Sequence, residues 1–105
     1  MDLADLAHPA RTVGWTACAI AEGVRTGALS PVHVVREHLA QIARHDAAIG
    51  AFQRVRADAA LREAALLAAH PQLASLPLAG VPIAIKDSIP VAGEPMRVGR
   101  RPPAA

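Results

Sequence analysis

Five consecutive apolar residues, VPIAI at positions 81–85, constrain the fold of this sequence more than any other feature. The run lacks the polar and apolar alternation of a half-exposed strand, which is typical of a strand covered on both faces in a parallel or mixed sheet. Pro82 has no N–H to donate to a neighbouring strand, so we expect it at the first positions of the strand or on an unpaired side. The run therefore predicts an α/β fold.

Two helices are predicted in the first half of the chain. Thr16 is suited to cap a short helix whose apolar residues recur at helical spacing and which ends within residues 23–27. Ser30, followed by a proline at the first helical position, predicts a second helix over residues 31–47. The second helix carries one apolar stripe, formed by Val32, Val35, Leu39 and Ile42.

A short strand and a third helix are predicted next. Gly50 should end the second helix, and residues 51–56 alternate apolar and polar side chains in the manner of a strand. Asp58 is placed to begin an alanine-rich helix, which should end at His70 because the residue before a proline is disfavoured in helical geometry. We therefore predict three helices packed around the first strands of a larger mixed sheet.

The core of such a fold would be small. Hydrophobic residues make up 52% of the chain, but 25 of them are alanine and only Trp15 and Phe52 are aromatic. The apolar area buried per residue is therefore low, and a strand at residues 81–85 would have an open edge and an uncovered face. We expect the chain to be incomplete as a domain, with poor solubility or partial disorder on its own.

Composition argues against several functional classes. The formal net charge is +2, and the arginines are spread from Arg11 to Arg101 without interleaved aromatic residues, so nucleic-acid binding is weakly supported. Cys18 is the only cysteine, which excludes an internal disulfide. The acidic opening MDLADLAH differs from a secretory signal, and no apolar run approaches the roughly 20 residues that cross a bilayer. We expect a cytoplasmic protein with no membrane association.

The histidines and the cysteine do not form a metal-binding pattern. His38 and His45 share a helix face, but seven residues rise about 10.5 Å along a helix, too far for both to bind one ion. His33 points away from His38, and Cys18 has no second ligand at a zinc spacing. The residues before Lys86 are apolar rather than glycine-rich, so they form no phosphate-binding loop. We expect neither a metal nor a cofactor.

Lys86, the only lysine of the chain, is the candidate catalytic residue. It follows the predicted strand, at the edge where ligands and catalytic groups gather in open α/β sheets. Partial desolvation there would favour the neutral amine, which can accept a proton. The alternative is a solvated pair of Lys86 and Asp87 at the end of a strand. Ser88 would face the same side as Lys86 in a strand, but no glycine elbow positions it as a nucleophile, so we interpret it as a turn former.

The segment LAGVPIAIKDSIPVAGEP, residues 78–95, resembles the catalytic-lysine segment of the amidase signature family, written G-V-P-x-x-x-K-D followed by V-x-G. The upstream segment GALSPVHVVREHLAQIARHDAAIGAFQRV, residues 27–55, is similar to the helices and short strand that precede it in the family. The resemblance covers residues 14–98. The matching positions around the lysine are Gly80, Val81, Pro82, Lys86, Asp87, Val91, Gly93 and Pro95.

The resemblance implies an amidase, a hydrolase of carbon–nitrogen amide bonds with a Ser-cis-Ser-Lys triad. Lys86 matches the lysine, which takes a proton from a serine held in a cis peptide, and that serine takes one from the nucleophilic serine. Both serines belong to a glycine- and serine-rich region downstream of the lysine, which this sequence lacks. We therefore expect an N-terminal fragment that is inactive alone.

In this interpretation residues 1–98 are the N-terminal part of an amidase domain, and residues 99–105 are an irregular tail left by truncation or a frame shift. A longer parent protein would act on a small-molecule amide without a cofactor. It would contact nucleic acid only as the amidase component of a tRNA-dependent amidotransferase. The oligomeric state stays open.

Two alternatives to the amidase interpretation remain at this point. A small helical interaction or adaptor domain would dock the apolar stripe of the second helix on a partner, without catalysis. A basic nucleic-acid module would need arginines clustered on one face. Neither alternative explains the GVPIAIKD motif.

Overall fold

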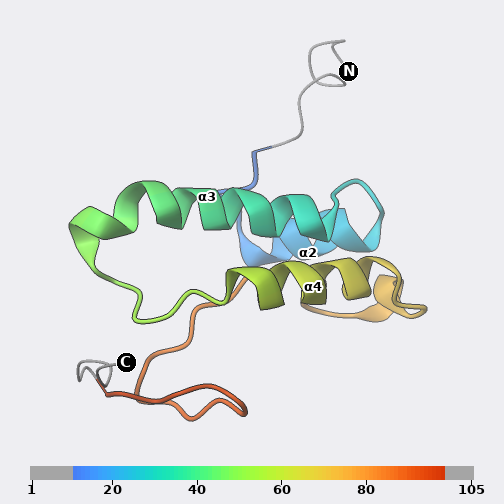
Figure 1. Ribbon diagram of the computed structural model, residues 1–105. Coiled ribbons are helices and arrows are strands. Elements are labelled where there is room, and N and C mark those ends of the chain that lie inside the picture. The colour runs from blue at the N-terminus through green and yellow to red at the C-terminus, as the bar shows by residue number, and fades with distance from the viewer. Residues whose placement is uncertain (1–10, 99–105) are drawn as a thin grey trace.

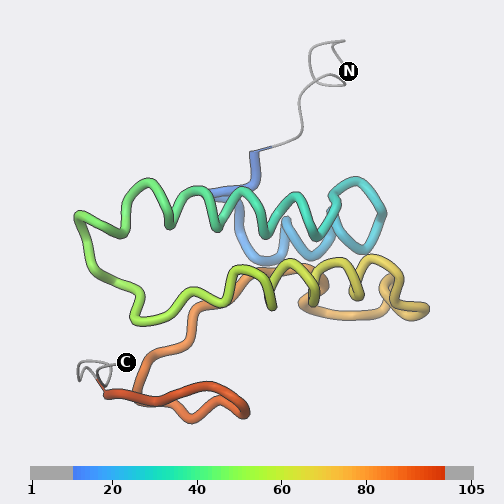
Figure 2. The backbone as a smooth tube through the Cα atoms, viewed as in Figure 1, coloured from blue at the N-terminus to red at the C-terminus, as the bar shows by residue number. Residues whose placement is uncertain are grey.

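The computed structural model describes residues 11–98, and the regular secondary structure in that range is helical. Three α-helices, α2 (Ala17–Arg25), α3 (Pro31–Ile49) and α4 (Ala57–Ala68), are followed by a short 3-10 helix, η1 (Leu73–Ser75). Helices α3 and α4 lie side by side, and α2 packs with η1 (Figure 1). Residues 81–98 leave the helices and turn back on themselves (Figure 2). The predicted tail, residues 99–105, lies outside the described residues.

Local capping interactions fix the helix boundaries. The Thr16 hydroxyl accepts a hydrogen bond from the N–H of Ala19 at 3.1 Å, which begins α2. The Ser30 hydroxyl accepts from the N–H of His33 at 3.3 Å, and a proline occupies the first position of α3. Gly50 ends α3 in the left-handed conformation with a φ of 69°. The predicted starts of α2 and α3 and the glycine stop are confirmed.

The third predicted helix is also confirmed, with boundaries close to those expected. Helix α4 begins one residue before Asp58 and ends at Ala68, two residues before His70. The N–H of His70 donates to the carbonyl of Leu67 at 2.9 Å, which closes the last turn ahead of the proline.

The buried core is small and lies between α2, the start of α3 and the segment around η1. Val34 of α3 is fully buried, although it lies outside the predicted stripe, whose four residues are only partly buried. Eight apolar side chains are buried in all among the described residues. They are Ile20, Ala21, Val24, Leu29, Pro31, Val34, Ala64 and Ala79.

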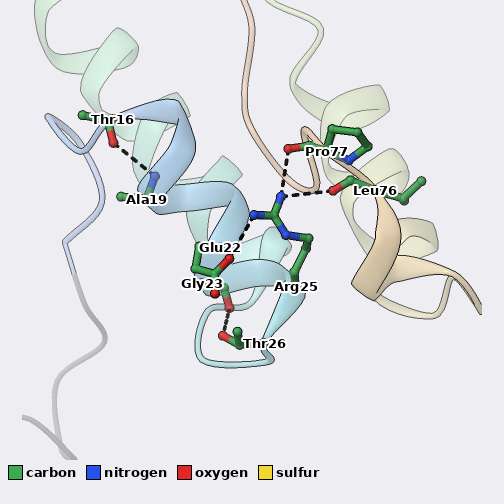
Figure 3. A network of polar contacts seen from close by, with 8 residues as sticks. All are labelled: Thr16, Ala19, Glu22, Gly23, Arg25, Thr26, Leu76 and Pro77. Atoms are coloured by element: carbon green, nitrogen blue, oxygen red, sulfur yellow. Dashed lines mark hydrogen bonds and ion pairs between the residues drawn. The ribbon is translucent and has the colours of Figure 1, made fainter.

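Arg25 ties the η1 segment to α2 (Figure 3). Its guanidinium donates to the carbonyl oxygens of Leu76 at 3.3 Å and Pro77 at 2.9 Å, and it pairs with Glu22 at 3.0 Å. This contact joins residues about 50 positions apart in the sequence. Its energetic basis is that the arginine donates hydrogen bonds to two carbonyl groups that lie outside the helices.

Gly80, the first residue of the G-V-P motif, packs directly against α2. Its φ is 71°, and a Cβ atom at this position would lie 2.8 Å from a methyl group of Val24. Both the left-handed backbone and the close approach therefore require glycine. The GVP motif therefore begins in contact with the core, and the chain leaves the core after Val81.

Neither predicted strand is formed in the described part of the chain. Residues 51–56 and 81–85 have irregular structure, because a strand needs a neighbouring ladder and residues 11–98 provide none for these segments. Among the described residues, the helices of the predicted α/β architecture are therefore present and its sheet is absent. None of the helices described is both long and apolar enough to cross a membrane.

Candidate functional site

Lys86 lies on a broad groove of about 1160 Å³. Four parts of the chain line this groove: α3, α4, residues 51–56 and residues 78–98. The side chain of Lys86 is exposed, so the expected desolvated position at a sheet edge is not what the structure shows. The cause is the missing sheet, because the segment that carries Lys86 has no neighbouring strand in the described chain to cover it.

The walls of the groove are strongly apolar. Of the twelve large hydrophobic residues that are exposed among those described, seven line it. They are Phe52, Val55, Leu78, Ile83, Ile85, Ile89 and Val98. Apolar side chains gathered in one concave surface are typical of a binding or interaction site.

Glu94 joins the two loops that form one side of the groove. Its carboxylate pairs with the guanidinium of Arg54 at 2.8 Å and with that of Arg56. Arg56 also pairs with Glu63 of α4 at 2.8 Å. Hydrogen bonds to Glu63 and Glu94 raise the pKa of Arg56, so this guanidinium stays charged. We call Arg54, Arg56 and Glu94 the carboxylate clamp.

Asp87, the residue after Lys86, closes the loop that follows the lysine. Its Oδ1 accepts a hydrogen bond from the backbone N–H of Arg97 at 2.8 Å. Within this loop, the N–H of Ile89 donates to the carbonyl of Lys86 at 2.9 Å, which forms a turn containing Ser88. The interpretation of Ser88 as a turn former is confirmed, and the strand that would have placed it beside Lys86 is absent from the described residues.

A second polar contact anchors the start of the described chain on α3. Thr12 is fully buried, and its N–H and hydroxyl both donate to Oε1 of Glu37, at 2.6 and 2.7 Å. Burial raises the pKa of Glu37, but these two hydrogen bonds and the charges of His33 and His38 outweigh it, so the pKa lies below its ordinary value. The sequence did not indicate this contact, because its partners lie 25 positions apart.

The remaining candidate ligands stay apart. Cys18 is exposed on α2, and His38 lies 2.8 Å from the carbonyl of Val34 in its own helix. Among residues 11–98, no three histidine, cysteine, aspartate or glutamate side chains gather as a metal-binding group.

The family model Amidase matches residues 33–102, more than half of the chain. The chain belongs to the amidase family. It is similar to the A subunit of the glutamyl-tRNA(Gln) amidotransferase from Lacticaseibacillus casei, with 43% identity over 69% of this chain and 15% of the relative. The same subunit from Acidothermus cellulolyticus is 41% identical over 82% of this chain and 17% of the relative.

A third such subunit, from Methylacidiphilum infernorum, is 44% identical over 70% of this chain and 14% of the relative. This amidase-family chain thus spans less than one fifth of the length of these relatives. No solved structure matches it. The resemblance of the lysine segment to the amidase signature family is confirmed, and the adaptor alternative is not favoured.

Proposed function

We propose that this chain supplies the lysine of an amide-hydrolysing site, with Lys86 as the residue that relays a proton. The observation that carries the proposal is the place of Lys86, inside the stretch that matches the amidase family and on the wall of the apolar groove. Membership of the family supports hydrolysis of carbon–nitrogen bonds as the reaction class.

In the proposed reaction, a serine oxygen attacks the carbonyl carbon of the amide. Its proton passes through a second serine to Nζ of Lys86 and then returns to the nitrogen that leaves. Water then hydrolyses the ester that remains. Neither serine is assigned among the three of this chain, since Ser30 caps α3, Ser75 lies in η1 and Ser88 lies in a turn. We therefore expect no turnover from the chain alone.

The proposed role places a condition on the surroundings of Lys86. A lysine accepts a proton only as the neutral amine, and burial favours that form. Because Lys86 is exposed here, its role requires that a covering surface exclude water from the groove.

The names of the relatives favour one setting for this chemistry. They are subunits of an amidotransferase that acts on glutamyl-tRNA(Gln). We propose that the protein to which this chain contributes either works in such an assembly or hydrolyses a small amide alone. Transfer of nitrogen to an acceptor would indicate the first, and release of ammonia without an acceptor would indicate the second.

A chimera tests the role of Lys86. Residues 1–98 of this chain would replace the matched stretch of the Acidothermus relative, and release of ammonia from simple primary amides would be measured. We expect Lys86→Met to reduce release to the background, because the serines lose their proton acceptor. Arg62→Met, which removes an exposed cation on α4, should leave release unchanged.

Two results would contradict the proposal. One is a Lys86→Met chimera that keeps its activity. The other is an inactive chimera with the natural lysine, when the unmodified Acidothermus relative is active in the same assay.

A further inference from the structure

We infer that Asp87 is a positioning residue for Lys86. Its carboxylate binds a backbone N–H at the far end of the loop that follows the lysine, and it forms no ion pair with the neighbouring ammonium. This inference rests on the proposed function, because it concerns how the base of that site is held. It gives a role to a residue that the proposed proton path does not use.

Two hydrogen bonds hold the backbone next to Lys86. The carbonyl of Lys86 accepts from the N–H of Ile89 at 2.9 Å, so Asp87 and Ser88 are the two central residues of a turn. Oδ1 of Asp87 accepts from the N–H of Arg97 at 2.8 Å, which joins the two ends of the loop over residues 87–97. These bonds restrict the backbone conformations from which the lysine side chain extends.

The same loop is held at a second place. Glu94 belongs to the carboxylate clamp, and its N–H donates to the carbonyl of Val91 at 3.1 Å. The clamp fixes the loop against residues 54–56, whereas the bond of Asp87 fixes it at the end where Lys86 lies. Of these two side-chain contacts, the bond of Asp87 is the one that acts on the residue next to the lysine.

The charge of Asp87 is not directed at the lysine. Among residues 11–98, none of the ion pairs includes Nζ of Lys86, so the solvated pair of Lys86 and Asp87 that the sequence allowed is not formed there. A carboxylate close to an ammonium favours the charged form. The proposed base must be the neutral amine, so a carboxylate that binds a backbone N–H suits this chemistry better than one paired with the lysine.

The position of the amine matters because proton transfer is short-ranged. A base must lie within hydrogen-bond reach of the proton that it accepts, and a displacement of about 1 Å can lower a rate about 100-fold. Without the bond of Asp87, the loop would be released at the end next to Lys86. The rate of the chemical step should then fall, whereas binding of the substrate should change little.

The bond itself is tested in the full 105-residue chain, where no activity is needed. Hydrogen exchange of the Arg97 amide would be followed by NMR in Asp87→Ala and in Asp87→Asn. We expect Asp87→Ala to speed this exchange by roughly ten-fold. Asp87→Asn should speed it less, because the side-chain oxygen of asparagine can accept the same hydrogen bond. Unchanged exchange of the α3 amides shows that each variant folds.

The consequence for Lys86 is measured in the chimera with the Acidothermus relative. Asp87→Ala should lower kcat for the release of ammonia about ten- to hundred-fold and leave KM nearly unchanged. Asp87→Asn should keep most of the activity. The acid limb of its pH–rate profile, where the amine loses its proton, should lie at the same pH as with aspartate. If Asp87 instead stabilised the ammonium by its charge, asparagine would move this limb to lower pH.

Asp46→Ala is the matched control. Asp46 also accepts backbone N–H bonds, from Ala51 at 2.7 Å and Phe52 at 3.3 Å, but it belongs to α3 and not to the loop that follows Lys86. Its replacement should lower kcat much less than Asp87→Ala does. An equal loss of kcat would show that any lost contact of this kind slows the reaction, and the inference would then be wrong.

Three further results would overturn the inference. They are an asparagine variant as slow as the alanine variant, an acid limb that asparagine moves, and Arg97 exchange that Asp87→Ala leaves unchanged. An inactive chimera together with faster Arg97 exchange in Asp87→Ala would refute the proposed function and leave Asp87 as the residue that closes the loop. A chimera that Lys86→Met inactivates and Asp87→Ala does not slow would refute the inference and leave the proposed function standing.

Discussion

Replacing Gly80 by alanine tests whether the GVP motif is a packing requirement of this fold. The substitution has two separate costs in the structure. A left-handed backbone costs a non-glycine residue about 1–2 kcal/mol, and Gly80 has a φ of 71°. The new Cβ would also lie 2.8 Å from Val24, which is fully buried, and such overpacking costs about 1–3 kcal/mol. The expected loss of stability is the sum, about 2–5 kcal/mol.

Gly50→Ala is the control that separates the two costs. Gly50 has a similar φ of 69°, but a Cβ there would meet nothing within 4 Å. It should cost only the backbone contribution, about 1–2 kcal/mol. Gly50 ends α3, and Gly80 packs against Val24 of α2. The loss of helical circular dichroism in a urea titration, at low protein concentration, therefore reports the stability of both variants.

The difference between the two variants is the decisive quantity. With a urea slope of about 1 kcal/mol per molar for a small protein, the midpoint of Gly80→Ala should lie roughly 1–3 M below that of Gly50→Ala. Equal midpoints would show that the contact with Val24 is not tight, and the packing explanation of the motif would then be wrong.

Two further variants probe the polar contacts. Glu94→Gln should speed hydrogen exchange at the amides of residues 89–94, because the carboxylate clamp loses the anion that its two arginines share. Glu63→Gln removes only the α4 partner of Arg56 and should change the exchange of residues 89–94 much less. Equal effects of the two variants would contradict the role of the clamp. The lowered pKa of Glu37 predicts that its contact with Thr12 stabilises the fold above the ordinary value of 4.5 and that this contribution is lost as the pH falls below 4.5 through the folded pKa. Thr12→Val removes the hydroxyl bond and keeps the backbone bond, so it should reduce this acid dependence in urea titrations, and an unchanged pH profile would refute the role of the hydroxyl.

The sequence predicted the helices because their boundaries depend on neighbouring residues. A hydroxyl at Thr16 or Ser30 satisfies an N–H three residues later, and Gly50 needs no partner to adopt its conformation. The same local logic failed for residues 81–85, since an apolar run predicts a strand only if another strand lies beside it. A pattern in one segment carries no information on whether the ladder partner is present.

Contacts between residues far apart in the chain could not be predicted from the sequence, for a different reason. The carboxylate clamp joins positions 38 apart, and no periodicity relates Glu94 to Arg56. Helix α3 shows the same limit, because its predicted stripe is one face, whereas Val34 packs on the α2 side with Ile20 and Val24. The burial of a helix residue depends on which elements surround it. The apolar pattern of the sequence identifies only the helix face that carries the most apolar residues.

The exposure of Lys86 has the same cause as the absence of a sheet among residues 11–98, because no neighbouring strand in that range covers the segment that carries it. The lysine comes directly after Ile85, so a strand that pairs with residues 83–85 would also remove water from the amine beside them. Covering the isoleucines and activating the base would then be one event, because a surface that excludes water from the isoleucines also disfavours the charged ammonium. Such coupling would keep the amine from acting as a base until the residues that supply the serines are in place. The proposed chemistry therefore requires that the water now around Lys86 be removed before this amine can act as a base.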